Sequence, residues 1–177
     1  MKPSNYSKNT SQEVVLTAIV AALYIVLTLV LAPLSFGIGL RISEGLNLLA
    51  LYNKRHIWAI TIGVFLVNYF AYGVLDMIVG SLSTLIFLYL GRWIADKVVD
   101  QIAKRHTLSI DPMIIKYIII TVVFSLSMFT IALVVLFLDA AAAFWPTYVS
   151  MVFIELLSMG IGGFIIYPLS KRIDLTK

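Results

Sequence analysis

Ionisable and amide side chains occur inside hydrophobic segments of this 177-residue sequence, where they are costly to bury and often functional. Arg41 and Glu44 stand three residues apart, and Asn47 follows after three more. On a helix, this spacing puts the three side chains on one face. The face offers a cation, a carboxylate and an amide, which suit a polar solute. The structural alternative is an internal ion pair of Arg41 with Glu44, with Asn47 holding a neighbouring helix.

Other polar side chains lie in later hydrophobic segments. Glu155 lies about a third of the way into the last one, without a basic residue within a turn of it. Asp76 begins a stripe that continues to Thr84, and Asn68 ends the preceding segment. We expect all four to complete the wall of a binding site. One alternative is that the Asp76 carboxylate is simply stabilised by the positive end of the helix dipole. The other is that the Asn68 amide packs between helices.

Two aromatic residues, Trp145 and Tyr148, lie just before Glu155 at the expected outer boundary of the membrane. We predict that they cover the binding site as a stacking lid. The alternative is an interfacial aromatic belt, in which such rings sit at the level of the lipid headgroups.

The sequence offers no constellation for catalysis. It contains no G-x-x-x-x-G-K-[ST] phosphate loop and no H-E-x-x-H, and it has no cysteine. His56 and His106 are expected in cytoplasmic loops, and no serine has a histidine or lysine at membrane depth to activate it. We therefore expect a protein that is not an enzyme and has no metal site or cofactor. The carboxylates, the guanidinium and the amides suit a small, flat, nitrogen-rich ligand.

The composition indicates what must position these side chains. Hydrophobic residues make up 61% of the chain and charged residues 12%, and the mean hydropathy is +1.01. A soluble domain carries roughly 45–50% apolar and about 25% charged residues. The chain therefore has too few charges to cover its core with a polar surface, and we predict a multi-pass protein of the cell membrane.

Six hydrophobic segments follow one another along the chain. We predict an all-α membrane protein with six transmembrane helices, two of them short. The domain limits are a polar cytoplasmic leader (1–12), a single transmembrane domain (13–170) and a cytoplasmic tail (171–177). The segments are Val14–Ala32, Ile42–Tyr52, Ile57–Phe70, Val74–Ile94, Ile114–Leu138 and Tyr148–Leu169.

The second and third segments are short for a bilayer core about 30 Å thick. Non-helical or interrupted backbone is tolerated at that depth where it is buried in protein or lines a cavity. We expect Ile42–Tyr52 and Ile57–Phe70 to line a cavity open to the outside. The alternative is a helical hairpin extended by its polar flanks.

The basic residues predict the orientation. With six crossings, Arg41 alone of the thirteen lysines and arginines falls on the outer side. Because cytoplasmic loops are enriched in Lys and Arg, both termini are expected in the cytoplasm. The net charge of +4 is thus a topology signal, and we expect no nucleic-acid partner.

These features resemble a known family. The stretch RISEGLNLLALYN (Arg41–Asn53) and the stretch IGVFLVNYFAYGVLDMIVGSLSTLI (Ile62–Ile86) are similar to the QueT subfamily. The whole pattern resembles the S component of an energy-coupling factor (ECF) vitamin transporter. The likeness runs from about Val14 to Leu169 and is sharpest at R-x-x-E and D-x-x-x-G-x-x-x-T.

The resemblance implies more than the spacing does. Such a subunit captures a queuosine precursor, or a vitamin such as pyridoxine or hydroxymethylpyrimidine, from outside. It then docks on a membrane-embedded T component that couples to two cytoplasmic ATPase subunits, so that ATP is used by the partners. Small residues on the first helix, Ala18, Ala21 and Ala22, would face the T component.

Three rival functions remain open. A self-sufficient, proton-coupled secondary transporter would use Glu155 as its proton site, although the chain lacks the inverted repeats common in such carriers. An intramembrane enzyme lacks a nucleophile or metal constellation. A purely structural subunit would leave the buried charges unexplained. In the leading hypothesis, Glu44 is the main acceptor of ligand N–H groups.

Overall fold

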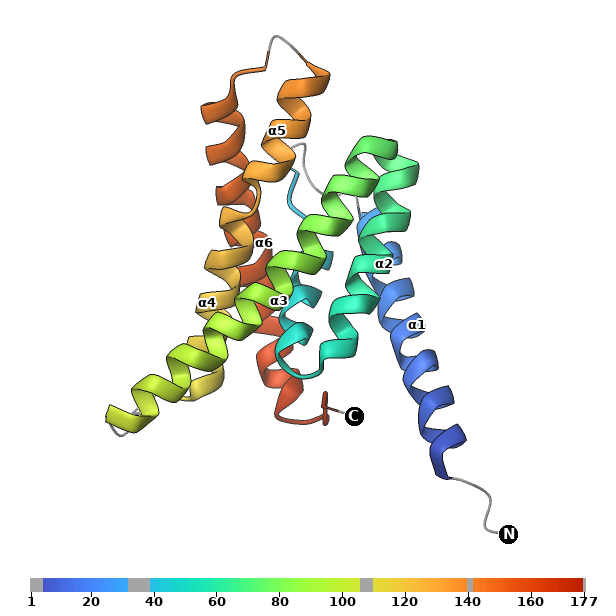
Figure 1. Cartoon of the computed structure of the whole chain (residues 1–177), viewed down its shortest axis with the longest axis vertical. Helices are drawn as coiled ribbons and strands as arrows, with labels where there is room; N and C mark the ends of the chain where they lie inside the picture. The colour runs from blue at the N-terminus through green and yellow to red at the C-terminus, as the bar shows by residue number, and fades with distance from the viewer. Residues whose placement is uncertain (1–4, 32–38, 106–109, 140–141, 177) are drawn as a thin grey trace.

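The computed structural model describes residues 5–31, 39–105, 110–139 and 142–176, and this part of the chain contains helices and no strand. Seven helical elements follow one another (Figure 1). They are α1 (Asn5–Leu31), the 3₁₀-helix η2 (Ile42–Leu51), α2 (Lys54–Ala71), α3 (Val74–Arg105), α4 (Pro112–Leu126), α5 (Phe129–Leu138) and α6 (Phe144–Ser170).

Four helical runs are long and apolar enough to cross a membrane: Ser11–Leu31, Val74–Lys104, Pro112–Leu138 and Phe144–Ser170. Large hydrophobic side chains are exposed along all of them, including Phe137 at 80% and Phe164 at 86%. So much exposed apolar surface is unfavourable in water, which indicates that lipid covers these faces. The prediction of an all-helical membrane protein is confirmed.

Several boundaries differ from the predicted segments. The helix α1 begins at Asn5, inside the expected leader, and α3 continues to Arg105 through the expected charged connection. The fifth segment is divided at Ser127 and Met128 into α4 and α5. The longer α1 and α3 arise because polar residues are compatible with a helix beyond the hydrophobic run, which hydropathy alone does not reveal.

The element η2 lies at the centre of the molecule. It packs against α6, α2 and α1, and its residues from Ser43 to Leu51 are all buried. It meets α6 at Gly45 and Gly162, where a Cβ on either residue would overlap the Cα of the other. This contact brings the two backbones together, which explains why glycine stands at both positions.

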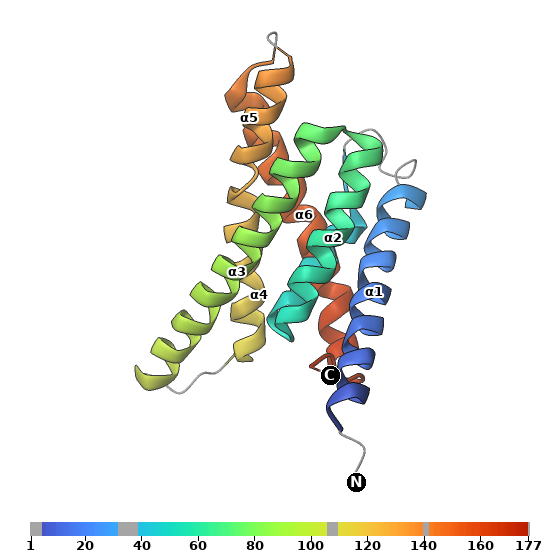
Figure 2. The ribbon, with the colours of Figure 1, turned by 45° about the vertical axis from the view of Figure 1, so that its right-hand side comes forward.

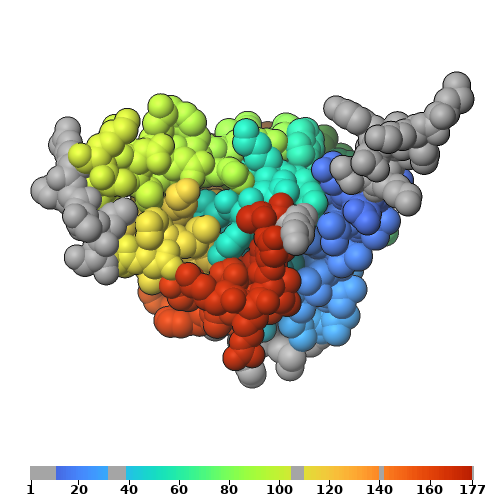
Figure 3. Space-filling model, turned by 90° about the horizontal axis from the view of Figure 1, so that it is seen from below, coloured from blue at the N-terminus to red at the C-terminus, as the bar shows by residue number. Residues whose placement is uncertain are grey.

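The two ends of the chain point the same way. In Figures 1 and 2, α1 begins and α6 ends toward the lower end of the molecule. Seen from that end, the segment after α6 lies against α1 and α2 (Figure 3). There the carbonyl of Thr176 accepts a hydrogen bond from Asn53 Nδ2 at 2.8 Å, and the carbonyl of Leu175 lies 3.3 Å from His56 Nε2.

The prediction that His56 lies in a loop is wrong. His56 lies in the first turn of α2 and is buried, because the C-terminal segment covers it. The other histidine, His106, lies outside the described residues.

Candidate functional site

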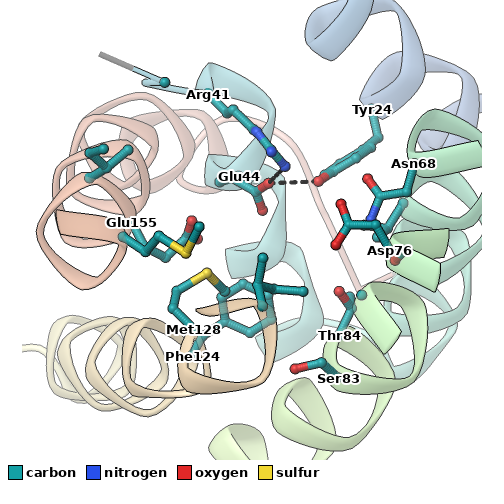
Figure 4. Close-up of a pocket in the computed structure, with 16 residues that line it drawn as sticks. Tyr24, Arg41, Glu44, Asn68, Asp76, Ser83, Thr84, Phe124, Met128 and Glu155 are labelled. Atoms are coloured by element: carbon teal, nitrogen blue, oxygen red, sulfur yellow. Dashed lines mark hydrogen bonds and ion pairs between the residues drawn. The ribbon is translucent and has the colours of Figure 1, made fainter. Parts of the chain in front are cut away.

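A cavity of about 200 Å³ lies among the helices. This is below the roughly 300–1,000 Å³ typical of pockets for drug-sized ligands, so it suits a small, compact molecule. Figure 4 shows the side chains that converge on it. The polar lining residues are Tyr24, Arg41, Glu44, Asn68, Asp76, Ser83, Thr84 and Glu155, and the others are Gly39, Val64, Gly80, Phe124, Met128, Ile131, Met151 and Ile154.

Glu44 is anchored to the protein through both carboxylate oxygens. Its Oε1 accepts a hydrogen bond of 2.8 Å from the Tyr24 hydroxyl and lies 3.5 Å from Arg41 Nη1. Its Oε2 accepts a hydrogen bond of 2.9 Å from Asn47 Nδ2. The spacing of three residues suits η2, because residues i and i+3 eclipse on a 3₁₀-helix.

Arg41 stands at the start of η2, with its guanidinium on Glu44. The same group lies over the Tyr72 ring, 5.1 Å from its centre, and its side chain is 36% exposed. The backbone N–H of Arg41 donates to Ser158 Oγ at 3.1 Å, which ties this position to α6. Arg41 thus forms the ion pair with Glu44 that the structural alternative predicts. Arg41 also lines the cavity.

Polar groups of α2 and α3 form one wall. Asn68 Nδ2 donates to the backbone carbonyl of Asp76 at 3.1 Å, and Gly80 leaves the space that the amide fills. Asp76 Oδ1 is buried and has no hydrogen-bond partner among the described residues. Thr84 is buried one turn further along the wall, and its neighbour Ser83 accepts from Thr130 Oγ1 at 2.9 Å.

Glu155 forms the facing wall on α6. The residue is 6% exposed, and its Oε1 finds no hydrogen-bond partner within the described part of the chain. Figure 4 shows Glu155 and Asp76 on opposite sides of the cavity. A buried carboxylate oxygen without a donor is unfavourable, and both oxygens can accept a hydrogen bond from a group outside the chain.

The remaining surface of the cavity is apolar and adaptable. Phe124 belongs to α4, Met128 directly precedes α5, and Met151 and Ile154 belong to α6. An aromatic ring and two thioethers favour contact with the face of a flat ring, because sulfur and aromatic groups are polarizable. The lining therefore combines polar groups at its edges with apolar surface for a planar ligand.

The structure brings most of the predicted site residues together. Arg41, Glu44, Asn68, Asp76, Thr84 and Glu155 line the cavity. Asn47 lies behind Glu44, is fully buried and does not line the cavity.

The expected aromatic lid is not found in this arrangement. Trp145 is 70% exposed, and the ring of Tyr148 stacks on Phe144, 5.7 Å between centres. The hydroxyl of Tyr148 donates to the carbonyl of Leu126 at 3.1 Å. Neither residue lines the cavity, because the first turns of α6 extend past it. This placement favours the alternative, an aromatic belt.

Several lining residues were not predicted. Tyr24 on α1 looks like one more apolar residue of that helix, and the hydroxyl that reaches Glu44 was the available signal. Phe124 and Met128 carry no polar signal at all. Their role follows from tertiary packing, which the sequence pattern does not specify.

The small residues of α1 fall on two faces. Ala18 and Ala22 are exposed, whereas Ala21 is buried with Tyr24 and Thr28. Ala21 therefore packs within the chain, and the other two lie on the outer surface of α1.

As for metals, the described residues contain no group of three or more His, Asp or Glu side chains placed to hold an ion. The cavity instead combines three carboxylates with a single guanidinium among its described lining residues. Carboxylate oxygens in such a cavity can accept hydrogen bonds from N–H donors.

Comparison with known proteins gives a consistent result. The sequence profile of the QueT transporter family matches residues 14–171. The queuosine precursor transporter QueT of Lactococcus lactis subsp. cremoris (strain MG1363) is 39% identical over 173 residues, which cover 96% of this chain and 99% of that protein. No solved structure matches the chain significantly.

Proposed function

The chain belongs to the QueT transporter family, and on that premise we propose that it binds a queuosine precursor in the cavity and delivers it across the cell membrane. A queuosine precursor is a 7-deazaguanine, a small, flat base rich in N–H groups. The Lactococcus relative is named for that substrate. Binding and transport, with no covalent step, are the proposed activity.

One observation carries this proposal: the buried, polar cavity of an otherwise apolar chain. Charged groups inside a membrane are expensive, yet Asp76 and Glu155 keep buried oxygens that no described residue satisfies. A guanine-like edge supplies adjacent N–H donors that match a carboxylate, and the apolar wall around Met128 matches the face of the base.

We further propose that the chain is the S component of an ECF importer and that it depends on a T component and two ATPase subunits. The absence of a phosphate loop from the sequence supports an external source of energy. The exposed Ala18 and Ala22 support a docking face on α1, because small residues allow a close approach of another helix.

The proposed topology has six crossings with both termini in the cytoplasm. Its support is the clustering of lysines and arginines at the end where α1 begins and α6 ends. In this topology, η2 and α2 are the two short crossings. The cavity then lies toward the outside, near the start of α3.

The test measures binding and transport separately. The purified chain is titrated with 7-aminomethyl-7-deazaguanine by tryptophan fluorescence, without ATP or an ion gradient. We expect saturable binding below micromolar concentration. In cells, uptake of the labelled base should require both this chain and active ATPase subunits.

Two results would contradict the proposal in different ways. Absence of binding to the purified chain would remove the substrate assignment. Uptake by proteoliposomes that contain this chain alone and carry a proton gradient would favour the secondary transporter, with Glu155 as the proton site.

A further inference from the structure

We propose that the outer surface of α2 and α3 binds anionic phospholipids, whose phosphate groups are held by Lys54 and Arg55 on α2 and by Lys97 on α3. This α2–α3 surface lies apart from the cavity, none of whose lining residues it uses. The proposed topology places it in the cytoplasmic leaflet. The inference therefore goes beyond the proposed function and needs no ligand in the cavity.

One exposed stripe of α2 changes from apolar to basic along its length. Spacings of three and four residues put its members on the same side of the helix. Lipid chains suit the apolar members, and tryptophan prefers the level of the headgroups, with basic residues next to it. The stripe consists of Phe65, Ile62, Trp58 and Lys54, all of them exposed, with Trp58 at 50%.

The exposed face of α3 repeats this order of side chains. Two aliphatic residues are followed by a tryptophan and then by a lysine, again at spacings of three and four residues. The members are Ile86, Leu90, Trp93 and Lys97, all of them exposed, with Trp93 at 60%. Two neighbouring helices thus present tryptophan and then lysine at the ends of their lipid-facing stripes.

The two helices remain neighbours down to this level. Figures 1 and 2 show α2 and α3 side by side, and the Asn68 amide fills the space beside Gly80. His56 stands twelve residues before Asn68, and Arg92 stands twelve residues after Gly80. These two side chains interact electrostatically. Because both helices also pack on η2, their exposed stripes face away from the centre of the molecule.

The basic residues of the α2–α3 surface lack acidic partners. Neither Lys54, Arg55 nor Lys97 forms an ion pair with a described residue, and the buried Nε of Arg55 has no hydrogen-bond partner there. A phosphate group accepts several charge-assisted hydrogen bonds and matches a guanidinium well. The ion pairs at this end use other basic residues, namely Arg92 and Lys116 with Asp96, and Lys171 with Asp111.

The position of these charges along α2 favours a lipid as the partner. The 18 residues of α2 rise about 27 Å, close to the thickness of a bilayer core of about 30 Å. Its first residues, Lys54 and Arg55, therefore lie at the level of the lipid phosphates. Basic side chains at that level attract anionic headgroups. A free phosphate could use the same charges but would leave Trp58 and Trp93 without a role.

Quenching of tryptophan fluorescence by brominated phospholipids tests the proposal. The chain has three tryptophans. Trp58 and Trp93 lie on the α2–α3 surface, whereas Trp145 lies in the first turn of α6, toward the opposite end of the molecule. The variant Trp145→Phe keeps the first two, and the double variant Trp58→Phe/Trp93→Phe keeps the third. Both are placed in vesicles of phosphatidylglycerol and phosphatidylcholine, with either lipid brominated.

We expect Trp145→Phe to be quenched more strongly when phosphatidylglycerol carries the bromine, with a relative binding constant of at least about five for the anionic lipid. Trp145 alone should show no preference. Added to Trp145→Phe, the pair Lys54→Gln/Arg55→Gln should bring the quenching by the two lipids close to equality, and Lys97→Gln should lower the preference separately. Lys104→Gln removes an exposed lysine farther along α3 and is the matched control that should keep it.

Equal quenching of Trp145→Phe by the two brominated lipids would overturn the inference. The same preference at Trp145 would also overturn it, because it would show general attraction of anionic lipid to the chain. So would an unchanged preference in Lys97→Gln and in the double glutamine variant; if the latter does not fold, Lys97→Gln decides. Loss of the preference in inorganic phosphate, but not in chloride of equal ionic strength, would identify free phosphate as the ligand and exclude the lipid.

Discussion

At the scale of single residues, polar atoms buried in an apolar chain are the clearest signal of function. Glu44, Asp76 and Glu155 stand out in the sequence because each interrupts a hydrophobic segment, and Arg41 directly precedes one. The structure brings them to one cavity. What the sequence could not reveal is which carboxylate is already satisfied, because Tyr24, the main partner of Glu44, lies 20 residues away on another helix.

The Glu44 network leads to the first prediction. In Glu44→Ala, the Tyr24 hydroxyl and Arg41 lose their shared acceptor, so the edge of the cavity loses its alignment and one charge. We expect ligand binding to weaken by about 2–5 kcal/mol, the usual cost of removing one partner of a buried charged pair. Calorimetric titration of the purified variant measures the change.

The matched control for that experiment is Glu13→Ala. Glu13 also carries a carboxylate but is exposed on α1. The Glu13→Ala variant should therefore bind ligand like the unaltered chain. If Glu44→Ala binds as tightly as Glu13→Ala, the Glu44 network has no part in recognition.

At the scale of helices, the contact of η2 with α6 joins two of the elements that line the cavity. Hydropathy identified both segments, but the sequence could not identify η2 as a 3₁₀-helix, since its hydrophobic pattern also fits an α-helix. The break at Ser127 was equally hidden, because Leu126 and Phe129 continue the hydrophobic run on either side. Tertiary packing determines both features.

The glycine contact gives the second prediction. In Gly162→Ala, the added Cβ would overlap the Cα of Gly45, so η2 must shift away from α6. We expect a loss of about 2 kcal/mol of stability from overpacking, measured by thermal unfolding in detergent, together with weaker ligand binding.

The same helix offers a matched control. Gly160 has nothing within 4 Å of an added Cβ, and alanine is a better helix former than glycine by up to about 1 kcal/mol. Gly160→Ala should therefore be neutral or stabilising. Equal melting temperatures for the two variants would contradict the close contact of η2 and α6.

Asp111 fastens the beginning of α4 to the end of α6 and gives the third prediction. Its Oδ2 accepts from Lys171 Nζ at 2.6 Å and from the Tyr167 hydroxyl at 2.9 Å, and its Oδ1 caps α4 through Met113 N–H at 2.8 Å. The hydrogen bond from Lys171, followed by those from Met113 and Tyr167, lowers the pKa of Asp111 to about 2.

The sign of the pH effect follows from this lowered pKa. A depressed carboxyl pKa stabilises the fold above the unfolded pKa of about 4, and the contribution is lost as the pH falls toward 2. We expect Asp111→Ala to cost about 1 kcal/mol between pH 5 and 8, mostly through the lost cap, because the ion pair is exposed and screened. The gap in melting temperature should narrow below pH 4. A gap that widens there would contradict the account.

At the scale of the whole molecule, composition sufficed to predict a helical membrane protein. In the structure, α1 begins and α6 ends at one end of the molecule; that this end faces the cytoplasm stays a prediction from the lysines and arginines. The apolar wall of the cavity was beyond sequence reasoning, because Phe124 and Met128 are indistinguishable from lipid-facing residues until the helices pack.

The outer face of α1 gives the fourth prediction. Ala18 is exposed and does not line the cavity, so Ala18→Leu should leave ligand binding unchanged. If this face docks on a T component, the larger side chain should prevent close approach, and uptake in cells should fall at least tenfold. Leu23→Phe enlarges another exposed position of α1 and should leave uptake normal. Normal uptake by both variants would show that this face has no docking role.

The central claim is that the ligand binds in the cavity between α3 and α6. Thr84 is buried and lines that cavity, whereas Leu82 on the same helix is 52% exposed toward lipid. Calorimetric titration of 7-aminomethyl-7-deazaguanine into Thr84→Phe and Leu82→Phe tests the claim most directly. We predict that Thr84→Phe fills the cavity and abolishes binding while Leu82→Phe binds one ligand per chain. Binding of unchanged affinity and stoichiometry in Thr84→Phe would contradict the claim.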